Sequence, residues 1–177
     1  MRSRLIAIAA AALVVMTACG GDEGPGTIKL YDPAPVPAVP DRTAAIDPSM
    51  SALGPDGQYW ATLSGGSTDQ TLTFLLTQAF FADACVEELG ADQCPNDYGT
   101  LDEPNALVTV PMTDVDSATV VADNRQNFAV TPQEMFILAG GQPPSEGAPE
   151  GFKYVPFPYL LTVRDGMVAE AHQIWLP

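Results

Sequence analysis

The first pattern along the chain is an uninterrupted apolar run from Leu5 to Met16, which carries no charged or polar side chain. Arg2 and Arg4 precede this run, and two small residues follow it before Cys19. A membrane span needs about 20 apolar residues, so the run is too short to cross a bilayer. A basic start followed by an apolar run of this length is typical of a signal peptide. The pattern therefore predicts a signal peptide over residues 1–18.

Residues 19–54 show no convincing apolar period. The segment begins with glycine-rich sequence and continues into Asp32–Pro40, where every second or third residue is proline. Proline-rich sequence favours extended polyproline II structure. Such a segment buries too little apolar surface to offset its ordering entropy. We expect a flexible tether over residues 19–54. The alternative is that the alternating run Thr27–Tyr31 forms an edge strand on the domain.

From residue 55 the pattern becomes that of a folded domain. The remaining length suits one core, and we expect a single domain over residues 55–177. Alternation of apolar and polar positions between turn residues predicts four strands, over residues 57–66, 71–76, 105–112 and 118–123. Pro111 indicates that the third of these lies at a sheet edge or contains a bulge.

Two segments have apolar positions spaced three to four apart. The first, Gln78–Gly90, predicts a helix that ends at Gly90, although helix and strand are hard to separate between residues 71 and 80. The second begins with a complete set of helix-start residues: Thr131 as the cap, Pro132 at the first helical position and Glu134 in a capping box. Two glycines then predict that the second helix ends at residues 140–141.

The C-terminal stretch carries the clearest hairpin pattern of the chain. Two alternating runs flank Asp165-Gly166, a dipeptide that favours a two-residue type I′ turn. Such a turn places Arg164 opposite Met167 and, further out, Tyr159 opposite His172.

Both faces of this hairpin carry apolar side chains, so we expect it inside the sheet, with Trp175 buried. The order of elements predicts an α+β fold, with a small, mostly antiparallel sheet of about six strands and two helices, ending in a β-hairpin.

Cys19 adds a prediction about location. The stretch Met16-Thr17-Ala18-Cys19 resembles a bacterial lipobox, in which the cysteine is lipidated and the signal peptide is cut before it; Met16 stands where Leu or Val is usual. Several acyl chains hold a protein firmly to a bilayer, at about 0.8 kcal/mol per buried methylene. We expect a lipid anchor on Cys19 and a domain on the extracytoplasmic face of the cell membrane. The alternative is an ordinary secretory signal with an incidental cysteine.

Charge limits the class of partner. The chain has a formal net charge of −15, and loss of residues 1–18 leaves five basic residues against 22 acidic ones, near −17. DNA and RNA are therefore unfavourable partners, because nucleic-acid binding needs a basic face. A cationic protein, peptide or metal ion is electrostatically easier, although high net charge also serves solubility.

Cys85 and Cys94 form the other cysteine pair. Outside the cytoplasm such a pair tends to oxidise, so we expect a disulfide between them. No basic residue lies between Arg42 and Arg125, so nothing nearby would lower a thiol pKa for catalysis.

Candidate chemistry is sparse. His172 is the only histidine, and Glu170 lies on the same face of its predicted strand. The pair would serve as a general base or a pH sensor, or it would be a solvated surface pair. Asp114 and Asp116 are paired carboxylates or the polar rim of a turn. Tyr59 and Trp60 point to opposite faces of a strand, so one of them is a candidate for exposure and binding.

One acidic loop offers oxygen ligands for calcium, which takes six to eight of them. Its spacing does not match an EF-hand, and a polar surface loop is the simpler interpretation. The candidate ligands are Asp92, Asn96, Asp97, Asp102 and Glu103. We expect no cofactor.

Several of these motifs also carry a family resemblance: DGQYWATL, TLTFLL, CPNDYG, LVTVPM and the closing hairpin from Pro158 to Pro177. In this order they resemble a group of uncharacterised secreted proteins and lipoproteins of actinobacteria. Leu75 departs from that group, which has an acid there, and the cysteine pair is extra. The resemblance implies the fold and the localisation but no activity.

These observations predict a lipid-anchored extracytoplasmic lipoprotein with a non-enzymatic binding or structural domain in the cell envelope. Its partner would be the membrane, through the lipid on Cys19, and an envelope protein or peptide, with a cationic one favoured by charge. The alternative is a small extracytoplasmic hydrolase that uses carboxylates or His172.

Overall fold

An eight-stranded sheet organises the computed structural model, which describes residues 29–49, 53–66 and 69–176. The predicted signal peptide and Cys19 lie outside the described residues. Strand order in the sheet is β1-β8-β7-β10-β9-β2-β3-β6. The bounds of its strands are β1 Asp32–Pro33, β2 Gly57–Gly66, β3 Thr71–Thr77, β6 Ala106–Pro111, β7 Ser117–Val121, β8 Asn127–Val130, β9 Tyr159–Arg164 and β10 Met167–Gln173.

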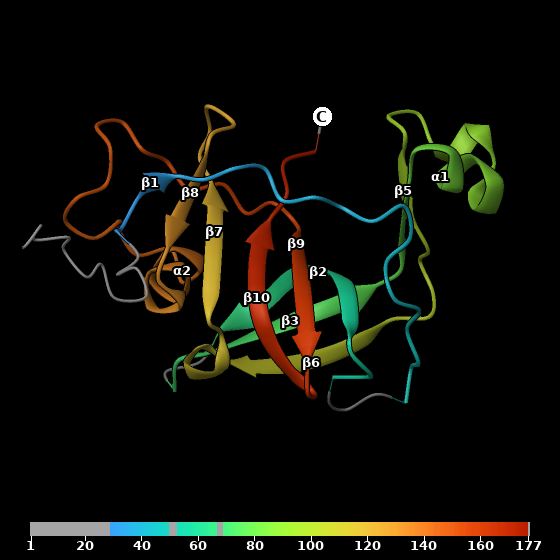
Figure 1. Cartoon of the computed structure of the whole chain (residues 1–177), viewed down its shortest axis with the longest axis horizontal. Coiled ribbons are helices and arrows are strands. Elements are labelled where there is room, and N and C mark those ends of the chain that lie inside the picture. The colour runs from blue at the N-terminus through green and yellow to red at the C-terminus, as the bar shows by residue number, and fades with distance from the viewer. Residues whose placement is uncertain (1–28, 50–52, 67–68, 177) are drawn as a thin grey trace, which may run out of the picture.

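A second sheet and the helices complete the described elements. The second sheet pairs β4 (Ala79–Phe81) with β5 (Tyr98–Thr100). The α-helices are α1 (Ala82–Leu89) and α2 (Pro132–Ala139), and two short 3₁₀ turns are η1 (Ala91–Gln93) and η2 (Met112–Asp114). Figure 1 shows α2 beside β7 and β8, whereas α1 and β5 lie at the opposite end of the molecule.

The predicted sheet was wrong in size. The main sheet has eight strands rather than about six. It is mostly antiparallel, as predicted, with one parallel pairing, between β10 and β7. The additional strands β1 and β8 have two and four residues, which is too short for an alternating pattern to be recognised. The parallel pairing depends on where the chain returns after α2, which no local pattern specifies. Both predicted helices are present, so the fold keeps an α+β character.

The predicted tether needs a second correction, because residues 29–49 lie against the domain. The short strand β1 pairs with β8, and Tyr31 is only 4% exposed. Further along, the amide of Ala44 donates to the Gln58 carbonyl (2.7 Å). The alternative prediction of an edge strand over Thr27–Tyr31 was displaced by a few residues, since the strand forms at Asp32–Pro33. Prolines lose little conformational entropy on ordering, so a few buried side chains suffice to hold this segment.

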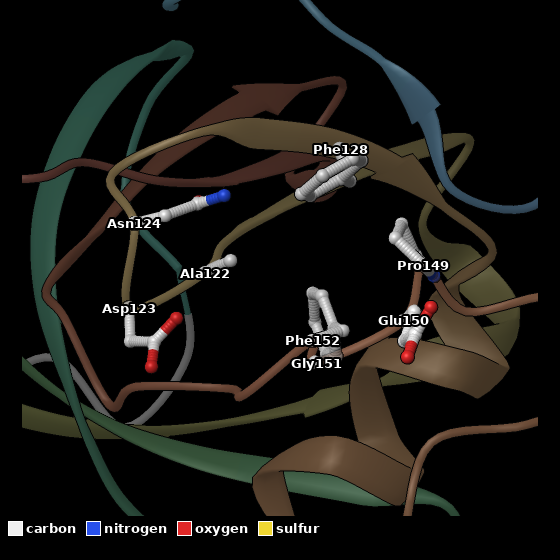
Figure 2. Close-up of a pocket in the computed structure, with 8 residues that line it drawn as sticks. All are labelled: Ala122, Asp123, Asn124, Phe128, Pro149, Glu150, Gly151 and Phe152. Carbon is white, nitrogen blue, oxygen red and sulfur yellow. The ribbon is translucent and has the colours of Figure 1, made fainter.

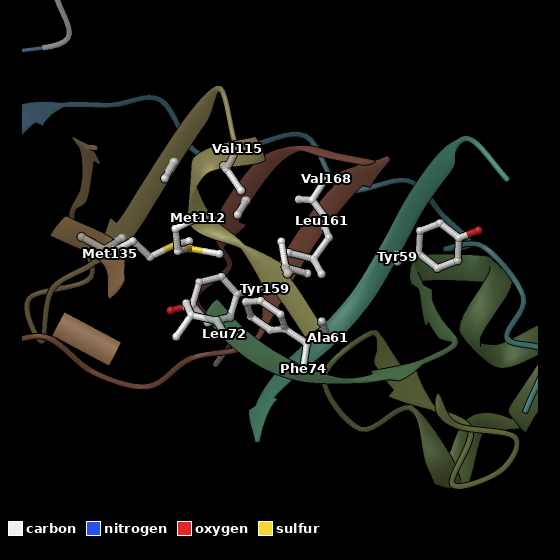
Figure 3. Packing of buried hydrophobic residues seen from close by; sticks show 14 of the residues in the cluster. Tyr59, Ala61, Leu72, Phe74, Met112, Val115, Met135, Tyr159, Leu161 and Val168 are labelled. Atoms are coloured by element: carbon white, nitrogen blue, oxygen red, sulfur yellow. The ribbon is translucent and has the colours of Figure 1, made fainter. Parts of the chain in front are cut away.

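The core lies inside a curled sheet. Figure 1 shows β2, β3 and β6 crossing behind β9 and β10, so the two halves of the sheet enclose the main apolar cluster. Figure 3 shows Met112 and Met135 at one end of this core and Tyr59 at the other. Trp60, Leu160 and Ile174 form a smaller cluster that is separate from it.

The terminal hairpin forms inside the sheet, as predicted. Asp165 and Gly166 have φ of 52° and 75°, which a type I′ turn requires, and Arg164 lies opposite Met167. β10 pairs with β7 on one side and with β9 on the other, so the hairpin is not at an edge.

The outer register of the hairpin was predicted wrongly. An irregularity between Val168 and Glu170 shifts the pairing by one residue, so His172 lies opposite Leu160 instead of Tyr159. The shift allows Val168 and Ala171 to face the same core. Trp175 follows the end of β10 and is half-buried rather than buried, with the Arg125 guanidinium 4.4 Å from its ring centroid.

Both helices end where the pattern predicted, but only α2 also begins there. α1 ends before Gly90 (φ 88°), as expected, but it starts at Ala82, because Ala79–Phe81 pair with β5. α2 matches the prediction: the amide of Glu134 donates to Thr131 Oγ1 (3.1 Å), and Pro132 takes the first position. Pro111 lies in the edge strand β6, as its inability to donate a ladder hydrogen bond suggested.

Candidate functional site

A row of four polar side chains crosses three neighbouring strands. Thr119 of β7 hydrogen-bonds through Oγ1 to His172 Nδ1 (3.0 Å), and His172 Nε2 lies 3.6 Å from Glu170 Oε2. Arg164 of β9 donates from Nη2 to Glu170 Oε1 (2.5 Å). Glu170 and His172 share a face because they are two residues apart on β10, as predicted. The parallel partner β7 brings Thr119 level with His172.

The environment of this row keeps its histidine neutral at pH 7. Burial lowers the pKa of His172 below its ordinary value of 6.5, although the negative charge of Glu170 opposes that shift. Burial alone would raise the pKa of Glu170, but the hydrogen bond and the charge of Arg164, followed by Thr162 and His172, bring it below 4.5. The row therefore contains a neutral imidazole between a hydroxyl and an arginine-paired carboxylate.

Wild-type stability should fall as pH drops below about 6.5. The folded pKa of His172 is lower than its unfolded value, so the unfolded state takes up its proton first. The stabilisation is complete above the unfolded pKa and is lost as pH falls towards the folded pKa. We expect His172→Gln to flatten the profile between pH 7 and 5, as measured by urea unfolding at each pH.

This result can be checked below pH 5, where Glu170 and other carboxylates titrate. There His172→Gln should still lose stability as pH falls, because Glu170 keeps its arginine partner, which holds its pKa low. An unchanged slope between pH 7 and 5 in His172→Gln would contradict the role of His172, since it is the only histidine in the chain.

The calcium candidates do not assemble into a site. Asp92, Asn96, Asp97, Asp102 and Glu103 are all exposed. Within the described residues, no three His, Cys, Asp or Glu side chains converge to hold a metal ion. The loop is organised by local contacts instead: the side-chain amide of Asn105 donates from Nδ2 to Glu103 Oε1 and to the Asp102 carbonyl, both at 3.1 Å.

Asp114 and Asp116 are also exposed. Thr113 Oγ1 donates to Asp114 Oδ1 (3.1 Å), and the amide of Asp116 donates to the Ala169 carbonyl (2.8 Å), where β10 is irregular. These contacts fit the polar rim of a turn.

The predicted disulfide is present between Cys85 and Cys94, whose Cα atoms are 6.0 Å apart. It joins α1 to the residue that follows η1, and both cysteines are buried with Phe80. Gly99 of β5 is packed against this bridge, because a Cβ there would lie 3.0 Å from Cys85 Sγ and 2.6 Å from a Leu89 methyl. The disulfide therefore stiffens the region of the small sheet.

Neither Tyr59 nor Trp60 is available for binding. They face different clusters, as their positions on one strand predicted, but they are 1% and 0% exposed. The Trp60 indole donates from Nε1 to Tyr98 Oη (3.0 Å), so its polar atom has a partner inside the protein.

The sequence analysis missed a buried carboxylate cluster around Glu134, which is 2% exposed. Its carboxylate accepts hydrogen bonds from the Tyr31 hydroxyl, the Ser145 hydroxyl and the Ser145 amide (2.8 Å). Burial, followed by the hydrogen bond and the charge of Glu134, raises the pKa of Tyr31 well above 10. The capping-box pattern did single out Glu134, but no pattern pointed to Tyr31 or Ser145 as its partners.

Two hollows lie outside the polar row. One, of about 40 Å³, is shown in Figure 2, with Phe128 of β8 and Phe152 of the loop before β9 among its walls; its lining is Ala122, Asp123, Asn124, Phe128, Pro149, Glu150, Gly151 and Phe152. The other, of about 170 Å³, is lined by Leu53, Thr109, Val110, Pro111, Asp114, Gly166, Met167 and Val168. Small-molecule sites usually measure about 300–1,000 Å³, so both hollows are small.

Within the described residues, no helix is long and apolar enough to cross a membrane. No family model, no curated protein and no solved structure matches the chain.

Proposed function

We propose that this protein is a lipid-anchored extracytoplasmic lipoprotein whose domain is a non-enzymatic binding or structural module of the cell envelope. The observation that carries the proposal is the pairing of cysteines. The chain has three, and Cys85 is bonded to Cys94, so Cys19 has no cysteine left to pair with inside the chain. Disulfides persist in oxidising compartments, which agrees with an exported domain.

The fold also bears on how far the domain would extend from the bilayer. Tyr31, 12 positions after Cys19, is already buried in the domain. That separation limits the distance between the lipid and Tyr31 to about 40 Å even in a fully extended chain. The partner of such a domain would lie at or near the membrane surface.

Replacing Cys19 by serine tests the anchor. We expect Cys19→Ser to remain uncut by the lipoprotein signal peptidase and to leave the detergent phase in phase-partition assays, because serine offers no thiol for the lipid. The control is the Cys85→Ala/Cys94→Ala double variant, which should partition like the wild type. If Cys19→Ser matures and partitions like the wild type, the proposed anchor is wrong.

A hydrolase that uses His172 is the second candidate, because a neutral imidazole lies within hydrogen-bond distance of the Thr119 hydroxyl. Two features of the geometry favour the binding module. Thr119 is only 8% exposed, and neither hollow includes a residue of the row. The comparison of His172→Gln with the wild type on a simple ester substrate separates the two, since a wild-type rate that disappears in the variant would favour the hydrolase.

We also propose that the chain belongs with the actinobacterial secreted proteins and lipoproteins that its motifs resemble. Four of the five motifs fall in β2, β3, β6 and the β9–β10 hairpin, which supply most of the main core, whereas CPNDYG runs from Cys94 into β5. Leu75, where that group has an acid, lies opposite Leu107 on β6 in this chain.

A further inference from the structure

We propose that the outer edge of β6 and the hollow at its C-terminal end bind an extended, basic peptide segment of a partner protein, which adds to the sheet as a further strand. This inference rests on the proposed binding function and names the chemistry of the partner. Strand addition uses main-chain hydrogen bonds for affinity and pockets for alternate side chains for specificity.

The first observation is that β6 is an open edge. It pairs with β3 on one side, and no described strand pairs with its other side. Its burial alternates, with Ala106, Val108 and Val110 in the core and Leu107, Thr109 and Pro111 exposed. Natural edge strands are usually protected by charged residues, especially lysine, or by proline. Residues 104–113 contain no charged side chain, so the protection of this edge is limited to Pro111, the last residue of β6.

The second observation is exposed apolar surface near both ends of β6. Leu107 is 56% exposed, and Met167, at the tip of the β9–β10 hairpin, is 53% exposed. They are two of the four large apolar side chains that are exposed among the described residues. Met167 lines the 170 Å³ hollow together with the last residues of β6, Thr109 to Pro111. An apolar side chain of an added strand would fit this hollow.

Charge selects the partner. The uncharged stretch is bounded by Asp102 and Glu103 on one side and by Asp114 and Asp116 on the other, and all four are exposed. A basic segment along β6 would meet opposite charges at both ends. A second copy of this chain would meet like charges in either strand direction, because both ends of β6 are acidic. The charge pattern therefore favours a basic peptide over self-association.

Hydrogen exchange on the full chain, purified in a mild detergent, tests the surface. The probe is a seven-residue peptide of alternating lysine and valine, and the matched control is the same peptide with glutamate in place of lysine. We expect the lysine peptide to slow exchange at residues 106–111, with binding that weakens as salt is raised. The glutamate peptide should leave exchange unchanged.

Two variants locate the binding. Leu107→Lys adds a positive charge and removes an exposed apolar group at the edge, so we expect affinity for the lysine peptide to fall about tenfold. Val86→Lys makes a comparable change on α1, where the side chain is 45% exposed, and should bind within about twofold of the wild type. Urea unfolding of both variants shows that they are folded.

Three results would overturn the proposal. The first is equal binding of the two peptides, and the second is slowed exchange in a segment other than β6. The third is slowed exchange of β6 in the absence of peptide that increases with protein concentration, because this would identify a second copy of the chain as the occupant. Phase partition of the same wild-type sample separates the two proposals. If the wild type does not partition into the detergent phase, the proposed lipid anchor is wrong. If it does partition there but the lysine peptide leaves hydrogen exchange of β6 unchanged, only the proposed binding surface is wrong.

Discussion

Replacing Glu134 by alanine should destabilise the domain by about 3–5 kcal/mol, because it leaves buried donors without acceptors. The Tyr31 hydroxyl and both the hydroxyl and the amide of Ser145 donate to this carboxylate, which is 2% exposed. Each buried donor left unpaired costs about 1–3 kcal/mol. Urea unfolding of the purified chain measures the loss. Because Tyr31 precedes β1, hydrogen exchange over residues 29–49 should also accelerate.

Two comparisons make this prediction specific. Glu134→Gln keeps the shape and one acceptor oxygen, so it should cost less than the alanine variant. Glu146→Ala removes an exposed carboxylate from the same loop as Ser145, and it should change stability by no more than about 0.5 kcal/mol. A loss below about 1 kcal/mol in Glu134→Ala would show that the cluster does not hold the N-terminal segment.

Replacing Gln173 by alanine should cost about 2–4 kcal/mol, for a related reason. Gln173 is 0% exposed, and its Oε1 accepts from the Val121 amide (2.9 Å). Its Nε2 donates to the Val155 carbonyl (2.9 Å) and to the Tyr154 hydroxyl (3.2 Å). One side chain thus connects β10 to β7 and to the loop before β9. Thermal or urea unfolding measures the effect.

The charged variant tests the same site by pH. Gln173→Glu keeps an acceptor for Val121 but loses the donors and buries a carboxyl group. Burial raises the pKa of such a group in the folded state, so the variant should lose stability as pH rises and regain part of it at acidic pH. Gln142→Ala, at an exposed glutamine, is the control and should be nearly neutral. A Gln173→Glu variant that is insensitive to pH would contradict burial of this side chain.

Local sequence patterns were sufficient to predict an element where its conformation depends on its own residues. β2 spans the ten residues that its alternation predicted, α2 begins and ends at its cap residues, and the hairpin turns at Asp165-Gly166. In each case the turn or cap chemistry is contained within a few neighbouring positions. The Cys85–Cys94 pairing was predictable for a similar reason, since one of only three cysteines was assigned to lipid.

Other features depended on distant segments. Thr119 meets His172 only because β7 and β10 pair in parallel, 53 residues apart in sequence. Glu134 finds Tyr31 across 103 residues, and Gln173 finds Val121 across 52. The apolar pattern requires only that a strand or a helix bury one face, so it leaves the partner of each buried polar group undetermined.

The N-terminal segment and the hairpin register also show which features local sequence determines and which depend on tertiary packing. Proline content favours an extended chain over Asp32–Pro40 but does not say whether it is free or bound; burial of Tyr31 and pairing with β8 decide that it lies on the domain. The turn at Asp165-Gly166 sets the inner register of the hairpin, whereas the irregularity at Ala169 lies where the Asp116 amide binds its carbonyl. Backbone conformation follows from nearby residues, but register, partners and burial follow from the packing of the whole core, because only there do distant groups compete for the same hydrogen bonds and space.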